Sequence, residues 1–237
     1  MSSIPVRSEP YQIDGGTQAG TISIPLSVRI AKRALDLVLS GVGLLILGLI
    51  FPFVALAVRL DSKGPLLYKQ RRAGALKGRT ATGQPRFLPF EMLKFRTMRV
   101  DAEKLTGVVL AEENDPRVTR VGRFIRKTSL DELPQLFNVV FKGNLSLVGP
   151  RPHAVHAKAV DRLYDEAVDG YFARHRVKPG ITGWAQINGW RGETDNQEKI
   201  QRRVEHDLYY IENWSVLFDL YILAMTPFAL LKTENAY

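Results

Sequence analysis

The sequence of 237 residues predicts an α+β protein that is predominantly helical. Three features indicate this class. Residues 37–58 (LVLSGVGLLILGLIFPFVALAV) form an uncharged apolar run that is long enough for a membrane helix. Apolar residues recur at helical spacing between residues 118 and 127 and between residues 200 and 211. Short apolar segments at residues 66–68 and 90–98 are strand candidates.

The composition excludes several classes of protein. Hydrophobic residues make up 45% of the chain, which is enough for a sizeable core and excludes a mainly disordered protein. The 33 Lys and Arg against 24 Asp and Glu give a net charge of +9, which favours an anionic partner. No cysteine is present, so disulfides, thiol catalysis and cysteine-containing metal centres are excluded. The glycine-rich phosphate motifs G-x-G-x-x-G and G-x-x-x-x-G-K are also absent.

The N-terminal part divides into a tail and an apolar segment. Residues 1–28 are rich in small and polar residues without a period, which predicts a flexible tail, and they lack the pattern of a signal peptide. Residues 29–60 form the predicted membrane segment, and residues 61–237 follow it as a separate domain. An ordinary buried helix is the alternative for the apolar run, although a run without a polar break favours the membrane.

The flanks of the apolar run indicate how it meets the membrane. Arg29, Lys32 and Arg33 precede it, and Arg59 and further cations follow it. Basic residues prefer the cytoplasmic side, so a straight span leaves one basic flank outside. Pro52 removes a backbone hydrogen bond inside the run and predicts a break there. We therefore favour a re-entrant helix-break-helix that enters and leaves on one side of the membrane.

The rest of the chain predicts mixed elements. After the strand at 66–68 we expect a basic loop at 71–86, the strand at 90–98 and a helix at 101–110. The basic amphipathic segment 118–127 suits lipid headgroups or an anion site better than a solvated surface. Residues 216–231 are apolar but short for a membrane span. With Tyr209, Tyr210 and Trp214 at headgroup level they predict an interfacial helix, and a buried C-terminal helix is the alternative.

Two adjacent carboxylates follow this basic segment. Ser129 and Glu132 match a capping box, but Pro134 would then lie inside the helix, whereas Asp131 as the cap would place Pro134 in the tolerated first turn. In both cases the positive end of a helix is expected to lower the pKa of Asp131 and keep it ionised. An ionised aspartate can serve as a cap, a metal ligand or a nucleophile, and the residues alone leave these three roles open.

Two further segments are suited to binding an anion. Arg151 lies between two prolines, which restrict its backbone, and a rigidly held guanidinium suits a bidentate phosphate contact. The glycine-dense segment 178–192 (KPGITGWAQINGWRG) lets backbone approach a ligand closely, and a structured turn around a buried Trp184 is the alternative. His153 and His156 lie three residues apart, but without a matching carboxylate or cysteine they indicate zinc only weakly.

Four motifs in order resemble the bacterial sugar transferase family, the monotopic phosphoglycosyl transferases that initiate surface-polysaccharide synthesis. They are KFRTM at 94–98, SLDELPQLFNV at 129–139, SLVGPRP at 146–152 and KPGITGWAQING at 178–189. The resemblance covers residues 29–237. The stretch NGWRGET at 188–194 and the ending Ala-Tyr are most similar to members that transfer glucose-1-phosphate.

The resemblance implies an architecture and a set of site residues. It implies a re-entrant helix broken at Pro52, although Phe51 stands where many members have Ser, and a cytosolic catalytic domain with interfacial helices on the bacterial inner membrane. It implies that Asp131 and Glu132 are the catalytic dyad and hold Mg²⁺. The residues expected to bind phosphate or substrate are Arg126, Arg151, Lys94, Arg96, Arg191 and Gln186.

The resemblance also implies a reaction. A UDP-sugar and undecaprenyl phosphate would give undecaprenyl-diphosphate-sugar and UMP through a phospho-sugar intermediate on Asp131, as the first step of exopolysaccharide, capsule or O-antigen synthesis. Glucose-1-phosphate is the favoured group and galactose-1-phosphate the next. The alternatives are a membrane-anchored glycosyltransferase that releases UDP and a non-enzymatic basic anchoring protein. A homodimer is compatible with the sequence. Nucleic acid is not an expected partner, because the cations do not form a stripe with stacking aromatics.

Overall fold

The computed structural model describes residues 25–79, 85–100, 115–153, 158–159, 162–163, 171–192 and 196–232. These residues are mostly helical and include three two-stranded sheets, as the predicted α+β class requires. Most of the predicted tail, the predicted helix at 101–110, His156, residues 193–194 and the final Ala-Tyr lie outside the described residues.

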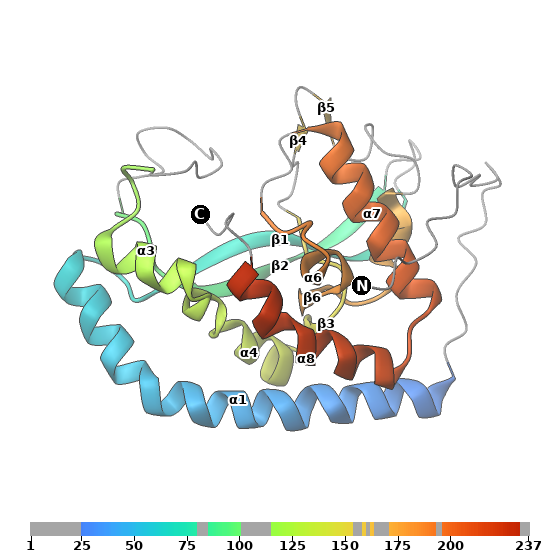
Figure 1. Cartoon of the computed structure of the whole chain (residues 1–237), viewed down its shortest axis with the longest axis horizontal. Helices are drawn as coiled ribbons and strands as arrows, with labels where there is room; N and C mark the ends of the chain where they lie inside the picture. The colour runs from blue at the N-terminus through green and yellow to red at the C-terminus, as the bar shows by residue number, and fades with distance from the viewer. Residues whose placement is uncertain are drawn as a thin grey trace.

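The predicted membrane segment is one long helix, α1 (Leu26–Asp61), which begins three residues before the expected boundary. Pro52 lies inside it, and the helix continues through the proline instead of breaking into two. Figure 1 shows that α1 lies along the lower side of the molecule and bends upward in its second half. A proline removes one helical hydrogen bond and crowds the preceding turn, which is a sufficient cause of this bend.

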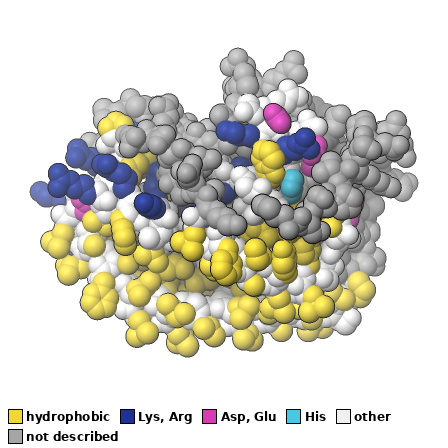
Figure 2. Space-filling view, in the orientation of Figure 1, with side chains coloured by type: hydrophobic (Ala, Val, Ile, Leu, Met, Phe, Trp, Pro, Cys, Tyr) yellow, Lys and Arg dark blue, Asp and Glu magenta, His cyan; other side chains and the backbone are white. Residues whose placement is uncertain are grey.

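The lower side of the molecule is apolar (Figure 2). Leu45, Leu49 and Phe53 of α1 are 74–75% exposed, and α1 is the one helix among the described residues that is long and apolar enough to cross a membrane. Helix α8 (Val216–Lys232) adds Leu217 and Leu231, which are 77% and 86% exposed. An exposed apolar surface of this extent marks an interface with a membrane or a partner. We call this surface, formed by the exposed apolar side chains of α1 and α8, the apolar face.

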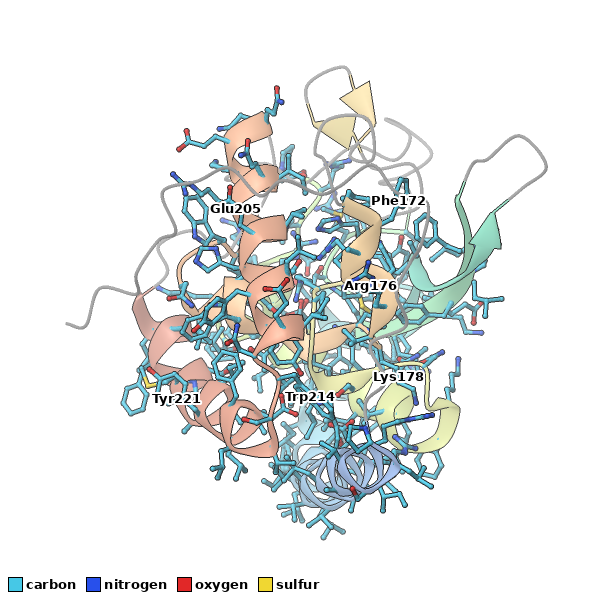
Figure 3. The ribbon with its side chains drawn as sticks, turned by 90° about the vertical axis from the view of Figure 1, so that its right-hand side faces the viewer. Phe172, Arg176, Lys178, Glu205, Trp214 and Tyr221 are labelled. Carbon is cyan, nitrogen blue, oxygen red and sulfur yellow. The ribbon has the colours of Figure 1, made fainter. Side chains whose placement is uncertain are left out.

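Helix α8 is neither fully buried nor purely interfacial. Ile222 and Asp219 are completely buried, whereas Tyr221 is half exposed and points away from the molecule in Figure 3. Tyr210, which we expected at headgroup level, is instead only 2% exposed, and its hydroxyl donates to Asp219 at 2.8 Å. The prediction for Tyr210 was therefore wrong, because a buried carboxylate on α8 needs donors.

A long two-stranded hairpin crosses the middle of the molecule (Figure 1). β1 (Leu67–Arg79) and β2 (Pro85–Phe95) pair antiparallel, with Leu67 opposite Phe95. The expected basic loop at 71–86 is therefore largely strand. Arg71 is exposed on this strand, whereas Arg72 is half-buried opposite the buried Phe90, so neighbouring cations of the strand point to opposite faces of the ribbon.

The elements after the hairpin lie on both sides of it (Figure 1). The predicted helices at 118–127 and 200–211 are confirmed, and the apolar positions Ile200, Val204, Leu208 and Ile211 of the second are buried. The elements are α3 (Arg120–Lys127), η1 (Leu130–Glu132), α4 (Gln135–Phe137), η2 (Asn138–Lys142), β3 (Ser146–Val148), β4 (Lys158–Ala159), β5 (Arg162–Leu163), η3 (Tyr171–Arg176), β6 (Gly180–Thr182), α6 (Trp184–Ile187) and α7 (Gln197–Glu212). β3 pairs with β6 in parallel, and β4 pairs with β5 in antiparallel fashion.

Both ends of α1 are fixed to the same domain. Near the N-terminal end, Lys32 donates to Asp219 at 2.6 Å, and Asp36 accepts from Ser146 Oγ at 2.8 Å. Trp214 also donates to Asp219, and Figure 3 shows it between α8 and α1. At the other end, Asp61 accepts from the backbone N–H of Val121 at 2.8 Å.

The middle of α1 packs closely on the domain as well. Leu47 and Val58 form a buried cluster with Phe95 and Ile125. A Cβ at Gly43 would lie 2.8 Å from the Leu136 side chain, so glycine permits the close approach of α4.

Candidate functional site

Five of the predicted site residues converge around Glu132. Glu132 and Asp131 lie in the short turn η1, Lys94 is at the end of β2, Arg151 follows β3 and Arg191 follows α6. Arg151 donates to both carboxylate oxygens of Glu132, to Oε2 at 3.2 Å, and Lys94 Nζ donates to Oε1 at 3.2 Å. Two cations from separate elements therefore hold the Glu132 carboxylate in place.

The backbone at Ser129 turns the chain into this cluster. Ser129 has a φ of 57°, the only positive value among the described residues other than glycine. Such a left-handed residue ends α3 and redirects the chain at a cost of about 1–2 kcal/mol. The Ser129 hydroxyl accepts from Arg191 at 2.7 Å and makes no capping bond. Neither expected cap exists, and Pro134 is the N-cap of α4, where its missing N–H has no cost.

Burial dominates the electrostatics of Asp131. Its side chain is 7% exposed, and no described residue donates a hydrogen bond to its carboxylate. Burial, with the charge of Glu132, raises the pKa of Asp131 to about 6 against the opposing effect of Lys94 and Arg126. The expectation of a lowered pKa was wrong, because η1 has only three residues and supplies no substantial helix dipole.

Glu132 shows the opposite behaviour. Burial would raise its pKa, but Arg151 and Lys94 outweigh burial and hold the pKa of Glu132 well below its usual range. The dyad therefore contains one carboxylate with a lowered pKa that two cations hold, and a second whose pKa is raised to about 6 and which accepts no hydrogen bond from the described residues. Opposite shifts in adjacent carboxyl groups indicate that the two have different chemical roles.

Two more cations surround the dyad. Arg126 of α3 donates to Thr97 Oγ1 at 2.8 Å and attracts Asp131. Arg191 has one buried guanidinium nitrogen, Nη1, with no hydrogen-bond partner in the described part of the chain. With Lys94 and Arg151, these give four cations against two carboxylates. The excess positive charge suits a di- or trianionic phosphate ligand.

Arg96 does not join the cluster. Its guanidinium donates to the backbone oxygens of Ser62 at 2.6 Å and Lys63 at 2.7 Å, at the end of α1. The last turn of a helix leaves carbonyls without partners, and Arg96 binds carbonyls just beyond that turn. The structure therefore does not bring Arg96 to the carboxylates, and its role in substrate binding stays a prediction. Gln186 is buried near the cluster, but it donates to the Ile181 oxygen and touches neither carboxylate.

A buried network behind Arg151 has no signal in the local sequence pattern. Arg174, which is 2% exposed, donates to the backbone oxygen of Arg151 at 2.8 Å and to Asp207 at 2.9 Å. His153 lies against the same guanidinium, and burial together with Arg174 holds its pKa well below the usual range. No group of three His, Cys, Asp or Glu able to hold a metal exists in the described ranges, so zinc at His153 finds no support there.

The comparison with known proteins decides the family. The model of the bacterial sugar transferase family matches residues 27–233. The chain belongs to this family. It is 50% identical, over 88% of its length, to the UDP-glucose:undecaprenyl-phosphate glucose-1-phosphate transferase of Escherichia coli K12. Proteins of the same name in Klebsiella pneumoniae and Caulobacter vibrioides are 47% and 40% identical, each over 98% of this chain. The chain spans 42%, 47% and 83% of the lengths of these three relatives, respectively.

The two carboxylates of the dyad suit Mg²⁺ only if a bound phosphate compound supplies further oxygen atoms to the ion. Two carboxylates are present, and Glu132 already accepts from two cations. Mg²⁺ is commonly held by one or two carboxylates, with waters and substrate phosphates as the other ligands. The donor set therefore fits a Mg²⁺ ion shared with a bound diphosphate.

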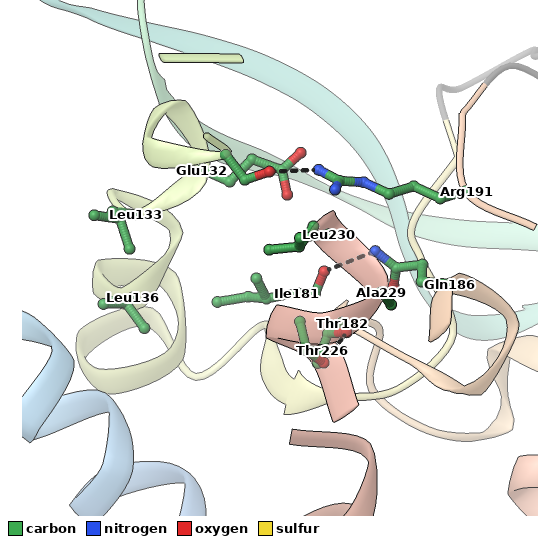
Figure 4. Close-up of a pocket in the computed structure, with 11 residues that line it drawn as sticks. Glu132, Leu133, Leu136, Ile181, Thr182, Gln186, Arg191, Thr226, Ala229 and Leu230 are labelled. Carbon is green, nitrogen blue, oxygen red and sulfur yellow. Dashed lines mark hydrogen bonds between the residues drawn. The ribbon is translucent and has the colours of Figure 1, made fainter. Parts of the chain in front are cut away.

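A second feature of the candidate site is an apolar cavity of about 170 Å³ beside Glu132 (Figure 4). It lies between α4, β6 and α8. Its lining residues are Ser129, Glu132, Leu133, Leu136, Ile181, Thr182, Gln186, Arg191, Thr226, Ala229 and Leu230.

Proposed function

We propose that this protein is a phosphoglycosyl transferase that moves glucose-1-phosphate from UDP-glucose to undecaprenyl phosphate and releases UMP. The observation that carries the proposal is the Asp131–Glu132 pair, whose pKa values are shifted in opposite directions inside a cluster of four cations. The relatives named as UDP-glucose:undecaprenyl-phosphate glucose-1-phosphate transferases support the donor, the acceptor and the transferred group. Galactose is the next candidate sugar, since a 40% identical relative is named a galactosyl transferase.

In the first step, an oxygen of the Asp131 carboxylate attacks the phosphorus that bears the sugar. The bond between this phosphorus and the bridging oxygen breaks, and UMP leaves with the electron pair. A carboxylate whose pKa is near 6 is more basic than an ordinary aspartate yet mostly ionised at pH 7. No described donor competes for its lone pairs, so Asp131 is suited to attack.

Glu132 and the cations prepare the site for this attack. Arg151 and Lys94 occupy the oxygens of Glu132, which makes Glu132 a positioning group and not a second nucleophile. The free nitrogen of Arg191, with Arg126 and Arg151, would stabilise charge on the phosphoryl oxygens. Asp131 and Glu132 would hold Mg²⁺, which neutralises diphosphate charge when bound.

In the second step, a phosphate oxygen of undecaprenyl phosphate attacks the same phosphorus. The bond to Asp131 breaks, and the free carboxylate returns. The bond between the sugar and its phosphate oxygen stays intact in both steps, so the anomeric configuration is retained.

We propose that α1 is re-entrant in the bacterial inner membrane and that its two ends face the cytoplasm. The contacts of α1 support this arrangement, because Lys32 near its start and Asp61 at its end both bond to one compact domain. A straight span would separate these two residues by about 30 Å of hydrocarbon. The bend after mid-helix and the apolar face agree with a helix that dips into one leaflet.

The test is nucleotide release by the detergent-purified protein with Mg²⁺, undecaprenyl phosphate and a panel of UDP-sugars. We expect UMP from UDP-glucose, loss of turnover in Asp131→Asn, and full activity in the control Glu205→Gln, which changes an exposed carboxylate on α7. Release of UDP would instead assign an ordinary glycosyltransferase. Vesicle binding without nucleotide release would assign a basic anchoring protein.

A further inference from the structure

We infer that the apolar cavity beside Glu132 binds the isoprene unit nearest the phosphate of the polyprenyl phosphate acceptor. This inference rests on the proposed function and adds the binding site of one substrate.

The walls of the cavity suit a hydrocarbon. Leu133 and Leu136 line one side, Ile181 another, and Ala229 and Leu230 of α8 close it (Figure 4). Thr182 and Thr226 share a hydrogen bond of 2.9 Å, and Gln186 donates to the Ile181 oxygen. Of the buried polar atoms of the lining, Gln186 Oε1 and Arg191 Nη1 have no partner among the described residues. A sugar ring needs several hydrogen-bond partners, and two such atoms are too few to replace its water. The lining therefore suits a hydrocarbon better than the glucosyl group.

The size of the cavity matches one isoprene unit. A dry cavity of about 150 Å³ lined by aliphatic side chains holds benzene, which has six carbons. This cavity measures about 170 Å³, and an isoprene unit has five carbons. One unit therefore fills the cavity, and the rest of a long polyprenyl chain must leave it.

The mouth of the cavity carries the groups that a phosphate needs. Glu132, Ser129 and Arg191 border it, and the buried Arg191 Nη1 has no partner among the described residues. An unpaired buried donor costs free energy until an acceptor arrives. A phosphate attached to an isoprene unit in the cavity would supply this acceptor and would lie next to the dyad.

The remaining chain would leave the cavity beside exposed apolar side chains. Two of the elements that line the cavity carry them: Phe228 and Met225 lie on α8, and Phe137 lies on α4. A hydrocarbon chain that leaves the cavity can pack against these side chains, whereas a water-soluble nucleotide gains nothing from them. This placement favours the membrane lipid over the nucleotide as the occupant.

Filling the cavity tests the inference. Ala229→Leu adds three carbons to its wall, and Ala224→Leu makes the same change on the exposed side of α8 as a matched control. Initial rates of UMP release are measured while one substrate is varied and the other is saturating. We expect Ala229→Leu to raise the KM for undecaprenyl phosphate about tenfold, since an isoprene unit would lose most of its apolar burial. The KM for UDP-glucose should stay within about twofold, and Ala224→Leu should match the wild type for both substrates.

The contrary outcomes are distinct. A higher KM for UDP-glucose with an unchanged KM for the lipid would assign the cavity to the nucleotide or sugar, and two unchanged values would show that it takes no substrate. Failure of the wild type to release UMP would refute the proposed function itself. If Ala229→Leu does not fold, wild-type inhibition by geranyl phosphate and n-decyl phosphate replaces it. Both have ten carbons, so stronger inhibition by the branched chain supports the inference and equal inhibition overturns it.

Discussion

Replacing Asp131 with Asn should stabilise the protein while it abolishes turnover. The pKa of Asp131 rises from 3.8 to about 6 on folding, mainly through burial, which corresponds to about 3 kcal/mol of destabilisation once the group is ionised in both states. Below pH 3.8 the group is protonated in both states and this cost is absent. As the pH rises through 6 the cost becomes complete, and asparagine, which carries no charge, avoids it.

The expected signature is a difference in melting temperature that depends on pH. For a chain of this size, about 3 kcal/mol corresponds to about 6–12 °C near pH 7.5. The difference between Asp131→Asn and the wild type should shrink toward zero near pH 4. Differential scanning fluorimetry in detergent across this range measures it, with Glu205→Gln as the control. A difference that stays constant with pH, or a variant less stable than the wild type at pH 7.5, would refute the assignment of a buried, destabilising carboxylate.

Three further predictions follow from the same geometry. The kcat/KM for UDP-glucose should fall below an apparent pKa near 6, by about tenfold between pH 7 and pH 5, because a protonated Asp131 cannot attack; a flat profile would exclude it as the nucleophile. Arg174→Ala should lower kcat at least about tenfold, because Arg174 holds the backbone of Arg151, and Arg174→Lys should recover part of the lost kcat. If Arg174→Ala had the melting temperature and the kcat of the wild type, the network would be dispensable. Asp219→Ala should lower the free energy of unfolding by about 3 kcal/mol, since it removes the buried carboxylate that accepts from Lys32, Tyr210 and Trp214. An unchanged thermal melt would contradict this role of Asp219.

The sequence predicted the parts of the site that depend on local pattern. The helix at 200–211 and the basic helix at 118–127 follow from side-chain period, and both exist. Arg151, which lies between two prolines, presents its guanidinium to Glu132 within the site, and its predicted contact with a phosphate stays a prediction. These features need only neighbouring residues, which is why the sequence suffices for them.

Other features depend on partners that are distant in the chain. The hydrogen bond between Arg174 and Asp207 joins residues 33 positions apart, so no local sequence pattern predicts it. Arg96 and Lys94 lie in the same KFRTM motif, yet their side chains bind different parts of the fold. Arg96 donates to the end of α1, and Lys94 donates to Glu132. The predicted lowering of the Asp131 pKa was wrong for a similar reason. That prediction used the local sequence at residues 129–134, whereas the burial that raises the pKa depends on the whole fold.

The position of the charged groups sets the depth of the molecule in a membrane. Arg120, Arg123 and Lys127 are exposed on α3, and Phe124 between them is 63% exposed. Figure 2 shows cations above the apolar face at the side where α3 lies. Cations prefer the headgroup layer and apolar side chains the hydrocarbon, so α3 would fix the protein at the boundary between the two. Asp131 follows α3 by only four residues, so in the proposed arrangement it would lie near the depth of lipid phosphates. At that depth a membrane lipid could reach the dyad with its phosphate.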